Sequence, residues 1–445
     1  MNDIIAAIAT PPGKGGVGIV RISGSDLSNV ALKIIGKLPP PRFAHFCQFK
    51  NNDEIIDEGL ALFFKAPHSF TGEDVLELQG HGGPVVMDQL LQAIIECGVR
   101  IAEPGEFSKR AFMNNKLDLA QAEAIADLID ASSAQAAKAA FKSLQGEFSI
   151  LINTLVAQLI HLRTYIEASI DFVDEEIDLI AEGNILLQLE KIQQKLNAVL
   201  QQANQGQLLQ EGMTVVIAGR PNAGKSSLLN QLTGRDSAIV TNIPGTTRDV
   251  LREFIQIDGL PVHIIDTAGL RLSNDVVEQE GVKRAKQAIA KADLLLYLRD
   301  IAVEKDNDWQ ALLTEIENCP PIVLVNNKID KVKVEPAVKK GKPDELFISI
   351  KQQYGVKLLT DYIKQFIGYK AEQASQFTAR RRHIDAINRA QQSIDNALQQ
   401  LKQKKTPELV AEDLRQAQHA LSEITGEFST DDLLGKIFST FCIGK

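Results

Sequence analysis

The sequence predicts a multidomain protein in which an α/β domain is inserted into an all-α helical domain that follows an α+β domain. Residues 1–118 mix short β-rich runs with glycine-rich turns, residues 119–210 and 371–445 have helical texture, and residues 211–370 alternate strands with helices. A chain of 445 residues is also too long for one ordinary hydrophobic core. We therefore expect these four segments to form three domains.

The composition, 44% hydrophobic and 24% charged residues, is typical of a soluble globular protein. No apolar run approaches 18 residues, so no membrane span is expected, and the start lacks the basic segment of a secretory signal. Four distant cysteines form no metal-ligand pair and favour a reduced, cytoplasmic setting. The net charge of −9 argues against a surface that binds nucleic acid everywhere, but it allows a local basic groove.

Residues 1–118 are predicted to form strands at VGIVRIS, GLALFF and DVLELQG and a helix near 85–97. The glycine run at 13–18 invites comparison with a phosphate-binding loop. No Lys-Ser/Thr pair follows it, and the glycines precede a strand instead of opening a helix, so a tight turn is expected. His81 is interpreted as a turn residue because no nucleophile motif accompanies it.

Residues 119–205 contain no proline and are rich in Ala, Gln, Leu, Ile and Glu, which predicts long amphipathic helices. The polar segments 201–212 and 368–376 are the expected hinges of the inserted domain. The termini of a compact domain often lie close together, so an insertion disturbs its host little. The acidic run at 171–178 is interpreted as a solvated helix boundary.

In the inserted domain, strands are expected at 214–219, 252–257, 262–266, 294–299, 322–327 and 346–350. Helices are expected between them: one from Lys225, one near 277–291, one between the strands at 294–299 and 322–327, and one between the last two strands. This alternation predicts a doubly wound α/β sheet.

Residues Gly219 to Ser226 match G-x-x-x-x-G-K-[ST] between a strand and a helix, the setting that a phosphate-binding loop needs. Backbone N–H groups and the helix N-terminus bind phosphate in such a loop. Lys225 is expected to bridge the β- and γ-phosphates, and Ser226 to ligate Mg²⁺. The expected contacts are Asn222, Ala223, Gly224, Lys225, Ser226 and Ser227.

Two later segments complete the expected phosphate site. Asp266 ends an apolar strand, where it is placed to hold Mg²⁺ through water, and Thr267, Ala268 and Gly269 follow, with the Gly269 N–H on the γ-phosphate. The expected switch loop contains Thr241, Asn242, Ile243, Pro244, Gly245, Thr246 and Thr247. Thr247 is the preferred Mg²⁺ ligand, and Thr246 remains the alternative. Leu270 stands where many GTPases have a water-orienting glutamine.

Asn327-Lys328-Ile329-Asp330 follows a strand and specifies the base. The Asp330 carboxylate can accept from both the ring N–H and the amino group of guanine, and adenine offers neither in that geometry. Ser349, Ile350 and Lys351 hold the place of a turn that supports guanine, with isoleucine in place of a small residue. Together these elements predict a P-loop GTPase domain of the Ras-like class.

The segments outside these motifs make the match more specific. They include ATPPGKGGVGIVRISG at 9–24, SFTGEDVLELQGHGG at 69–83, PGEFSKRAFMNNKLDLAQAEAIADLI at 104–129 and the terminal FCIGK. With GRPNAGKSSLLN and IPGTTRDV, they make the chain resemble the MnmE (TrmE) family of tRNA-modification GTPases over nearly its whole length.

The resemblance implies a homodimer built on the N-terminal domains. It also implies an FAD-dependent partner, MnmG (GidA), in a heterotetramer or larger assembly. Together such proteins add a carboxymethylaminomethyl-type group to carbon five of the wobble uridine of certain tRNAs. The N-terminal domain would have a folate-binding fold and take 5-formyl- or 5,10-methylene-tetrahydrofolate, for which the family's pattern gives Arg21, Glu77, Lys116 and Lys445.

The resemblance further implies that K⁺ activates hydrolysis when the GTPase domains dimerise. Its ligands would be Asn222, Thr241, Thr246 and the Ile243 backbone, and a fixed cation would stabilise charge on the leaving phosphate. Glu278 would help position the attacking water, beside Lys225, Thr247 and Gly269. Arg248 and Arg271 remain rival sources of positive charge.

Three features remain open. Arg380–Arg382, Arg389, Lys402, Lys404 and Lys405 give the C-terminal helices a basic character, either as a tRNA or partner surface or as ordinary helix charges. Cys442 is flanked by Phe441 and Ile443, which favours a thiol in an apolar site over a nucleophile. A ribosome-assembly GTPase and a folate-dependent aminomethyltransferase remain alternative functions, although no G-x-x-G loop of a KH module occurs in 376–445.

Overall fold

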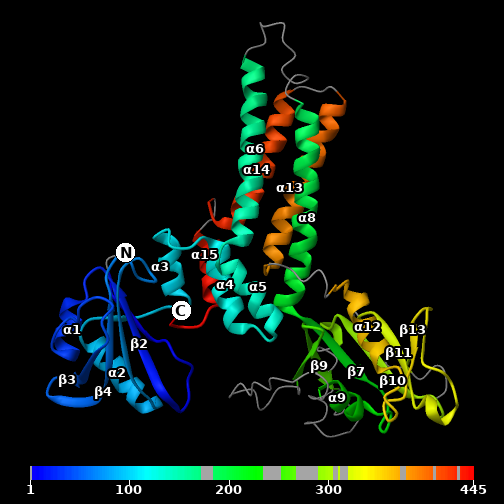
Figure 1. The fold of residues 1–445 in the computed structure, drawn as a ribbon, viewed down its shortest axis with the longest axis horizontal. Coiled ribbons are helices and arrows are strands. Elements are labelled where there is room, and N and C mark those ends of the chain that lie inside the picture. Colours follow the sequence, from blue (N-terminus) through cyan, green and yellow to red (C-terminus); the bar gives the residue numbers. More distant parts are fainter. Residues whose placement is uncertain are drawn as a thin grey trace. The chain divides into compact units, whose positions relative to one another are not determined.

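The computed structural model shows two compact units (Figure 1). The first unit contains Met1–Ala126, Ser143–Leu196 and Ala386–Lys445, and the second contains Asp127–Lys142 and Asn197–Asp385. The residues that the structure describes are 3–171, 184–233, 252–266, 289–303, 309–310, 319–370, 377–403, 407–427 and 431–444.

The N-terminal part of the first unit is a six-stranded sheet in the order β3-β4-β5-β2-β1-β6, antiparallel except where β1 pairs with β6. Helices α1 (Ser28–Ile35) and α2 (Pro84–Glu96) pack against it, and Ile22, Phe49, Leu76 and Leu90 are buried between the layers. The expected α+β domain is confirmed. Its strands are β1 (Ile5–Ile8), β2 (Gly15–Gly24), β3 (His45–Asn51), β4 (Glu54–Phe64), β5 (Asp74–Gly82) and β6 (Arg100–Ile101).

The glycine run at 13–18 differs from the expected tight turn, because Gly15 to Gly18 belong to strand β2 and contain a register shift against β5. A Cβ at Gly18 would lie 2.4 Å from Met87 Sδ, and one at Gly82 would lie 2.7 Å from the Val17 carbonyl oxygen. Glycine is therefore needed here for the close approach of β2, β5 and α2.

The first unit also contains a helical bundle. Helix α6 packs along α14, and α8 contacts α13 through a hydrogen bond from Gln193 to Asp395. Segments from before and after the α/β region thus meet in one bundle, which is the expected consequence of an insertion (Figure 1). The helices outside the N-terminal sheet and the α/β segment are α3 (Glu106–Met113), α4 (Leu119–Asp130), α5 (Ala134–Leu144), α6 (Glu147–Asp171), α8 (Ile185–Glu211), α13 (Arg381–Lys402), α14 (Pro407–Thr425) and α15 (Asp431–Ser439), of which α5 belongs mostly to the second unit.

One expected hinge is wrong. Residues 201–211 continue helix α8 without a break, because Leu208 and Leu209 pack against the hydrophobic core of the second unit. Only at Gly212, with φ 70°, does the chain turn into the first strand of the sheet. The other expected hinge, 368–376, lies largely outside the described residues.

The second unit contains a seven-stranded sheet in the order β12-β13-β11-β10-β7-β9-β8. Its five inner strands are parallel, and β8 and β12 are antiparallel edges. Strand β7 lies between β9 and β10, so the strand order reverses at its carboxyl end, the place where such sheets bind ligands. The strands are β7 (Met213–Ala218), β8 (Arg252–Ile257), β9 (Leu260–Asp266), β10 (Leu294–Asp300), β11 (Ile322–Asn327), β12 (Ala337–Lys339) and β13 (Asp344–Phe347).

Two described helices accompany this sheet, α9 (Lys225–Thr233) and α12 (Val356–Ile367). The helix expected between β11 and β13 is wrong: the chain forms a single 3-10 turn, η1 (Ile329–Lys331), and then the edge strand β12. Pro336, Gly341 and Pro343 interrupt this segment, and two prolines without N–H donors disfavour a helix. The helix expected near 277–291 lies almost entirely outside the described residues.

Helix α5 packs with the second unit although it lies far from the sheet in sequence. Ala136 and Ala139 share a buried cluster with Leu209, Met213 and Val262. The turn between β8 and β9 lies against this helix. Gln256 Nε2 donates to the Ser132 carbonyl at 2.7 Å, and Tyr369 Oη donates to Gln135 Oε1 at 2.6 Å. No helix among the described residues is long and apolar enough to cross a membrane.

Candidate functional site

The phosphate-binding loop lies between the end of β7 and the start of α9. Gly219 has φ 145°, and a Cβ there would lie 2.1 Å from the Leu298 carbonyl oxygen on the neighbouring strand β10. Gly224 has φ 107°, and a Cβ there would lie 2.5 Å from Asn327 Nδ2. Both glycines of the motif are therefore required by the backbone and by its close neighbours.

The polar groups of the loop are placed at the start of α9. Lys225 Nζ donates to the carbonyl oxygens of Gly219 at 2.7 Å and Arg220 at 3.1 Å, so the lysine folds back over the loop. Ser226 and Ser227 are exposed in the first helical turn. The first N–H groups of a helix have no partner within it, and this position favours a bound phosphate.

Asn327, at the end of β11, joins three parts of the site. Its buried side-chain Oδ1 accepts from the backbone N–H of Lys328 at 2.8 Å and of Ile350 at 3.1 Å. Its Nδ2 donates to the Ala223 carbonyl oxygen at 2.8 Å. One carboxamide thus connects the phosphate loop to both segments expected to contact guanine.

Lys328 makes a second connection to the phosphate loop. Its backbone has the left-handed φ of 65°, and its Nζ donates to the Asn222 carbonyl at 2.8 Å and to Asp300 Oδ2 at 2.6 Å. Burial acts to raise the pKa of Asp300, but the hydrogen bond and charge of Lys328 outweigh it, so the pKa is lowered. Asp300 is therefore ionised at neutral pH, and its contact with Lys328 holds the lysine side chain across the site.

Asp330 is exposed at η1, and Ser349 Oγ donates to its Oδ1 at 2.5 Å. This contact orients one carboxylate oxygen. Ile350, which follows Ser349 in the sequence, has a buried side chain, and its backbone N–H donates a hydrogen bond to Asn327 Oδ1. The isoleucine is accommodated because its side chain packs into the hydrophobic core of the unit, while Lys351 is exposed.

Several expected site residues lie outside the described part of the chain. Asp266 is the last residue of β9 and pairs in register with Ile217 of β7, so its backbone lies at the same sheet edge as the phosphate loop. The remainder have no described position: Thr241, Asn242, Ile243, Pro244, Gly245, Thr246, Thr247, Arg248, Thr267, Ala268, Gly269, Leu270, Arg271 and Glu278.

A second group of expected residues meets in the N-terminal domain. Arg21 Nε donates to Glu77 Oε1 at 2.9 Å, and its Nη1 donates to the Gly444 carbonyl at 3.3 Å. The guanidinium also lies 5.6 Å from the ring centre of Phe70 and 5.8 Å from that of Phe107. Arg21, Glu77 and the chain end are thus brought together. Lys116 instead donates to the Pro67 carbonyl at 3.0 Å, and Lys445 lies outside the described residues.

The expected apolar environment of Cys442 is wrong. Its thiol is exposed, whereas Phe438 and Phe441 are the buried side chains of this segment. The tail is fixed through its backbone: the Gly105 N–H donates to the Cys442 carbonyl at 3.4 Å. A Cβ at Gly105 would lie 2.6 Å from the Phe438 carbonyl oxygen, and one at Gly444 would lie 2.5 Å from the Ile8 carbonyl oxygen. Sequence reasoning missed both glycines and Phe70, because their roles depend on contacts between distant segments.

Two further expectations change. His81 belongs to strand β5 and not to a turn, and its ring Nδ1 lies 2.8 Å from Asp57 Oδ1. Of the basic residues singled out above, Arg380, Arg389 and Lys402 form ion pairs with carboxylates in the described part of the chain. These pairs are Arg380–Asp127 at 2.7 Å, Arg389–Glu423 at 2.5 Å and Lys402–Glu190 at 3.3 Å.

Comparison with known proteins agrees with this architecture. The MnmE helical domain profile matches residues 119–442, and the profile of the GTP-binding protein TrmE N-terminus matches residues 4–116. The chain is 54% identical to the tRNA modification GTPase MnmE of Hydrogenovibrio crunogenus and 56% identical to that of Chromohalobacter salexigens. These matches cover 100% of this chain and 99% and 98% of those proteins. Among solved structures, the G domain of the T. maritima FeoB iron transporter is 26% identical over 35% of this chain and 98% of its own, with a TM-score of 0.26.

Proposed function

The chain belongs to the MnmE family of tRNA modification GTPases, and from this premise we propose that it couples GTP hydrolysis to modification of the wobble uridine of certain tRNAs. The added group is of the carboxymethylaminomethyl type and is attached to carbon five. An FAD-dependent partner, MnmG (GidA), performs the redox part of this chemistry in a heterotetramer or larger assembly. A folate supplies the one-carbon unit.

The observation that best supports GTP as the nucleotide is the bridge made by Asn327. It holds the loop that contains Asp330 at a fixed distance from the phosphate loop, through Ala223. Ser349 orients the Asp330 carboxylate, which then accepts from guanine. Asp330, Ser349, Ile350 and Lys351 are the proposed base-binding residues, and Asn327 and Lys328 support them.

The phosphate side of the site contains oxygen atoms that can act as ligands of Mg²⁺. Ser226 offers an exposed hydroxyl at the start of α9, and the β9 strand ends with Asp266 at the same sheet edge. Oxygen ligands of this kind are those that Mg²⁺ prefers. We assign Ser226, Asp266 and Thr247 to the metal, and Lys225 and the Gly269 N–H to the phosphates. The bound ion would neutralise charge on the β- and γ-phosphates.

The same loop offers a ligand for K⁺. Asn222 is exposed and has a φ of 65°. Its backbone carbonyl oxygen accepts a hydrogen bond from Lys328 Nζ. The oxygen of its side-chain carboxamide is the proposed ligand. Thr241, Thr246 and the Ile243 backbone would complete the site when two GTPase domains meet. The cation and Glu278 would then replace the glutamine that Leu270 cannot provide.

The folate site is proposed at Arg21 and Glu77. A pterin presents a cyclic amide and an amino group to a carboxylate such as Glu77, and the partly exposed Phe70 ring near Arg21 provides apolar surface. Lys116 and Lys445 would attract the folate glutamate tail. The homodimer is proposed to form through these N-terminal domains.

GTP turnover by the purified chain, measured in K⁺ and in Na⁺, tests the hydrolytic part. The Asn222→Ala variant should bind a fluorescent GDP analogue normally but lose the K⁺ stimulation, an effect on the order of 10²-fold for a missing transition-state contact. Asn204→Ala, another exposed asparagine in the second unit, is the matched control. Equal turnover in the two salts would reject the K⁺ site.

Nucleoside analysis of tRNA from cells lacking the protein tests the biological part. Wobble uridines without the modification are expected. Addition of the wild-type chain with its flavoprotein partner should restore the modification. Fully modified tRNA together with defective ribosomes would instead support a role in ribosome assembly.

A further inference from the structure

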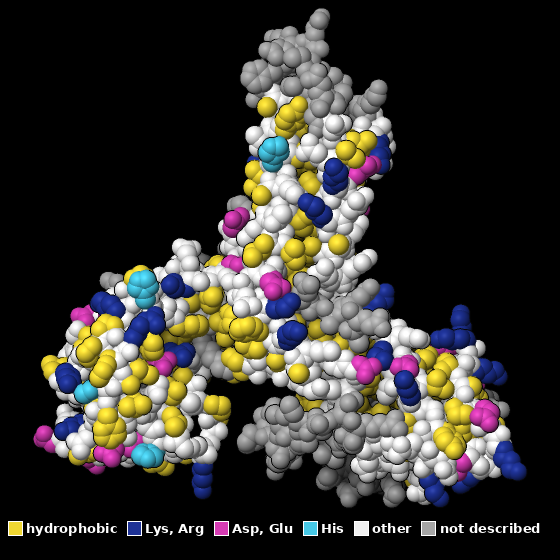
Figure 2. All heavy atoms as spheres, viewed as in Figure 1, with side chains coloured by type: hydrophobic (Ala, Val, Ile, Leu, Met, Phe, Trp, Pro, Cys, Tyr) yellow, Lys and Arg dark blue, Asp and Glu magenta, His cyan; other side chains and the backbone are white. Residues whose placement is uncertain are grey.

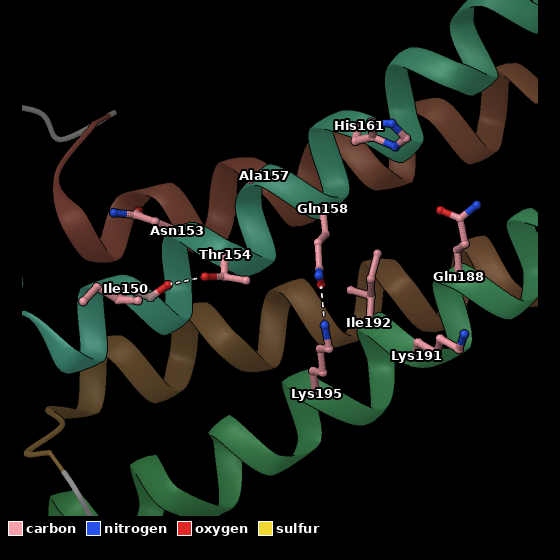
Figure 3. A pocket seen from close by; sticks show the side chains of 10 residues that line it. All are labelled: Ile150, Asn153, Thr154, Ala157, Gln158, His161, Gln188, Lys191, Ile192 and Lys195. Carbon is pink, nitrogen blue, oxygen red and sulfur yellow. Dashed lines mark hydrogen bonds between the residues drawn. The ribbon is translucent and has the colours of Figure 1, made fainter.

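A groove runs between helices α6 and α8 of the bundle and contains none of the nucleotide motif residues (Figure 3). Its volume is about 750 Å³. Figure 2 shows hydrophobic side chains set among polar ones on the surface of this bundle. The groove is lined by Ile150, Asn153, Thr154, Ala157, Gln158 and His161 of α6 and by Gln188, Lys191, Ile192 and Lys195 of α8.

Two lysines give the groove its charge. Lys191 and Lys195 are exposed and one helical turn apart, about 6 Å along the axis. Within the described residues, neither forms an ion pair: Lys195 Nζ contacts only the Gln158 amide oxygen at 3.3 Å, as Figure 3 shows, and Lys191 has no polar partner. The neighbouring carboxylate of Glu190 is paired with Lys402.

The lack of an ion pair within the described residues distinguishes Lys191 and Lys195 from the basic residues of the C-terminal helices that sequence analysis singled out. Arg380, Arg389 and Lys402 are each neutralised by a carboxylate in the structure. None of the ten described residues that line the groove is acidic. The groove therefore presents positive charge that no lining carboxylate neutralises.

The uncharged polar side chains of the groove indicate which chemical groups a bound ligand can present to it. Asn153, Gln158 and Gln188 have carboxamides that both donate and accept hydrogen bonds. A ribose 2′-hydroxyl also donates and accepts, and phosphates accept from lysine. The lining contains no Phe, Tyr or Trp on which bases could stack. This combination fits an RNA backbone and not its bases.

We infer that the α6–α8 groove binds the sugar–phosphate backbone of a folded RNA, with Lys191 and Lys195 on neighbouring phosphates. Taking that RNA to be tRNA rests on the proposed function. Recognition is by charge and shape, so it does not depend on base sequence. Ile150, Ala157 and Ile192 form the apolar part of the groove lining.

The test is binding of a fluorescent tRNA transcript to the full-length chain, followed by anisotropy over a range of salt concentrations. Lys191→Gln/Lys195→Gln should weaken binding on the order of tenfold at about 0.1 M salt, because two phosphate contacts and their released counterions are lost. The slope of log affinity against log salt should become shallower by about 1.5 to 2. A transcript with the same fold and a changed sequence should bind equally well.

Two controls separate the groove from general charge. Lys33→Gln/Lys37→Gln removes the same charge from two exposed lysines four residues apart in the N-terminal domain, and it should leave binding unchanged. Ala157→Trp fills the groove without changing charge and should weaken binding, whereas Ala168→Trp, at another exposed alanine of α6, should not.

Three results would overturn the inference: equal tRNA binding by the groove variants and the wild type, equal losses in the groove and control variants, or loss only of binding to the flavoprotein partner. GTP turnover of each variant, measured in K⁺, should match the wild type. If the proposed function is wrong, cells lacking the protein should still have modified wobble uridines. That outcome does not depend on this groove.

Discussion

Asn327 Nδ2 at the end of β11 donates a hydrogen bond to the carbonyl oxygen of Ala223 in the phosphate loop, over 2.8 Å. The two residues are 104 positions apart in the sequence. The side chain is almost fully buried, and Gly224 leaves the space that it occupies. The loops proposed to bind the base and the phosphates are thereby connected by a direct hydrogen bond.

Asn327→Ala should weaken nucleotide binding. The substitution leaves the N–H groups of Lys328 and Ile350 and the Ala223 carbonyl without their partner, at about 1–3 kcal/mol for each group that stays buried. We expect affinity for a fluorescent GDP analogue to fall roughly 10- to 100-fold in an equilibrium titration. Asn204→Ala is the control, and an unchanged dissociation constant for Asn327→Ala would contradict the bridging role.

Asp330→Asn should change the preferred base. The amide presents an N–H where the carboxylate accepts, and xanthine has a carbonyl where guanine has its amino group. Competition binding should therefore show GTP weakened and xanthosine triphosphate strengthened, each by about tenfold or more. Asp361→Asn, a carboxylate of α12 in the same unit, should leave the ratio of the two affinities at the wild-type value. If Asp330→Asn also leaves that ratio unchanged, Asp330 does not contact the base.

Gly259→Ala should destabilise the second unit. Gly259 has φ 86° in the turn between β8 and β9, and a Cβ there would lie 1.8 Å from Gln135 Oε1, the acceptor of the Tyr369 hydroxyl. Left-handed strain and overpacking together should lower the free energy of unfolding by about 2–4 kcal/mol. The measurement is denaturant unfolding followed by circular dichroism.

Gly368→Ala is the matched control for that prediction. Gly368 has a similar φ of 73° in the same unit, but a Cβ there would meet nothing within 4 Å. It should cost only the backbone strain, about 1–2 kcal/mol. Equal losses in the two variants would show that the contact with α5 adds nothing to stability.

The His81–Asp57 pair should make stability depend on pH. The hydrogen bond and charge of Asp57 raise the pKa of His81 above 6.5. Burial acts to raise the pKa of Asp57, but the hydrogen bonds from the His81 backbone and ring outweigh it and lower that pKa. A raised histidine pKa stabilises the folded protein below the unfolded value of 6.5, and this contribution is lost as pH rises through the folded value.

Comparison of thermal unfolding of the wild type and His81→Gln across pH 5.5–8.5 measures this effect. The advantage of the wild type should shrink as pH rises from about 6.5 through the raised pKa of His81. An NMR titration of the His81 ring gives the folded pKa directly. A folded pKa at or below 6.5 would contradict the prediction.

Most elements could be predicted from local pattern. The strands of the α/β unit follow apolar runs, and α2 begins where Pro84 suits a first helical turn. Two errors arose where distant contacts override the local pattern, whereas Pro336 and Pro343, which disfavour a helix after β11, are visible in the sequence. The glycine run at 13–18 looks like a turn, but its residues from Gly15 onward belong to strand β2, where Gly18 lies close to Met87 and Gly82. The polar stretch after Gln201 looks like a hinge, but it stays helical because its leucines pack against the sheet unit.

The candidate site shows the same division. The phosphate loop, the Asp266 strand end and the Asn327–Asp330 motif are readable from sequence, because their chemistry needs particular residues at fixed spacing. The basic residues at 380–402 were a weaker guide, since pairing with Asp127, Glu423 and Glu190 cannot be seen along the chain. For the same reason, the two groove lysines, which form no ion pair with a described carboxylate, did not stand out.

By itself the sequence determined the domain textures, the nucleotide chemistry and the family, because these depend on short-range periodicity and on motifs with fixed spacing. Only the tertiary structure decided that Asn327 joins the two nucleotide loops, that α5 packs with the sheet unit, and that the chain end lies against Arg21 and Ile8. Each of these depends on groups more than 70 residues apart. Their meeting is set by burial of apolar surface and pairing of buried polar groups across the whole fold, which local propensity does not encode.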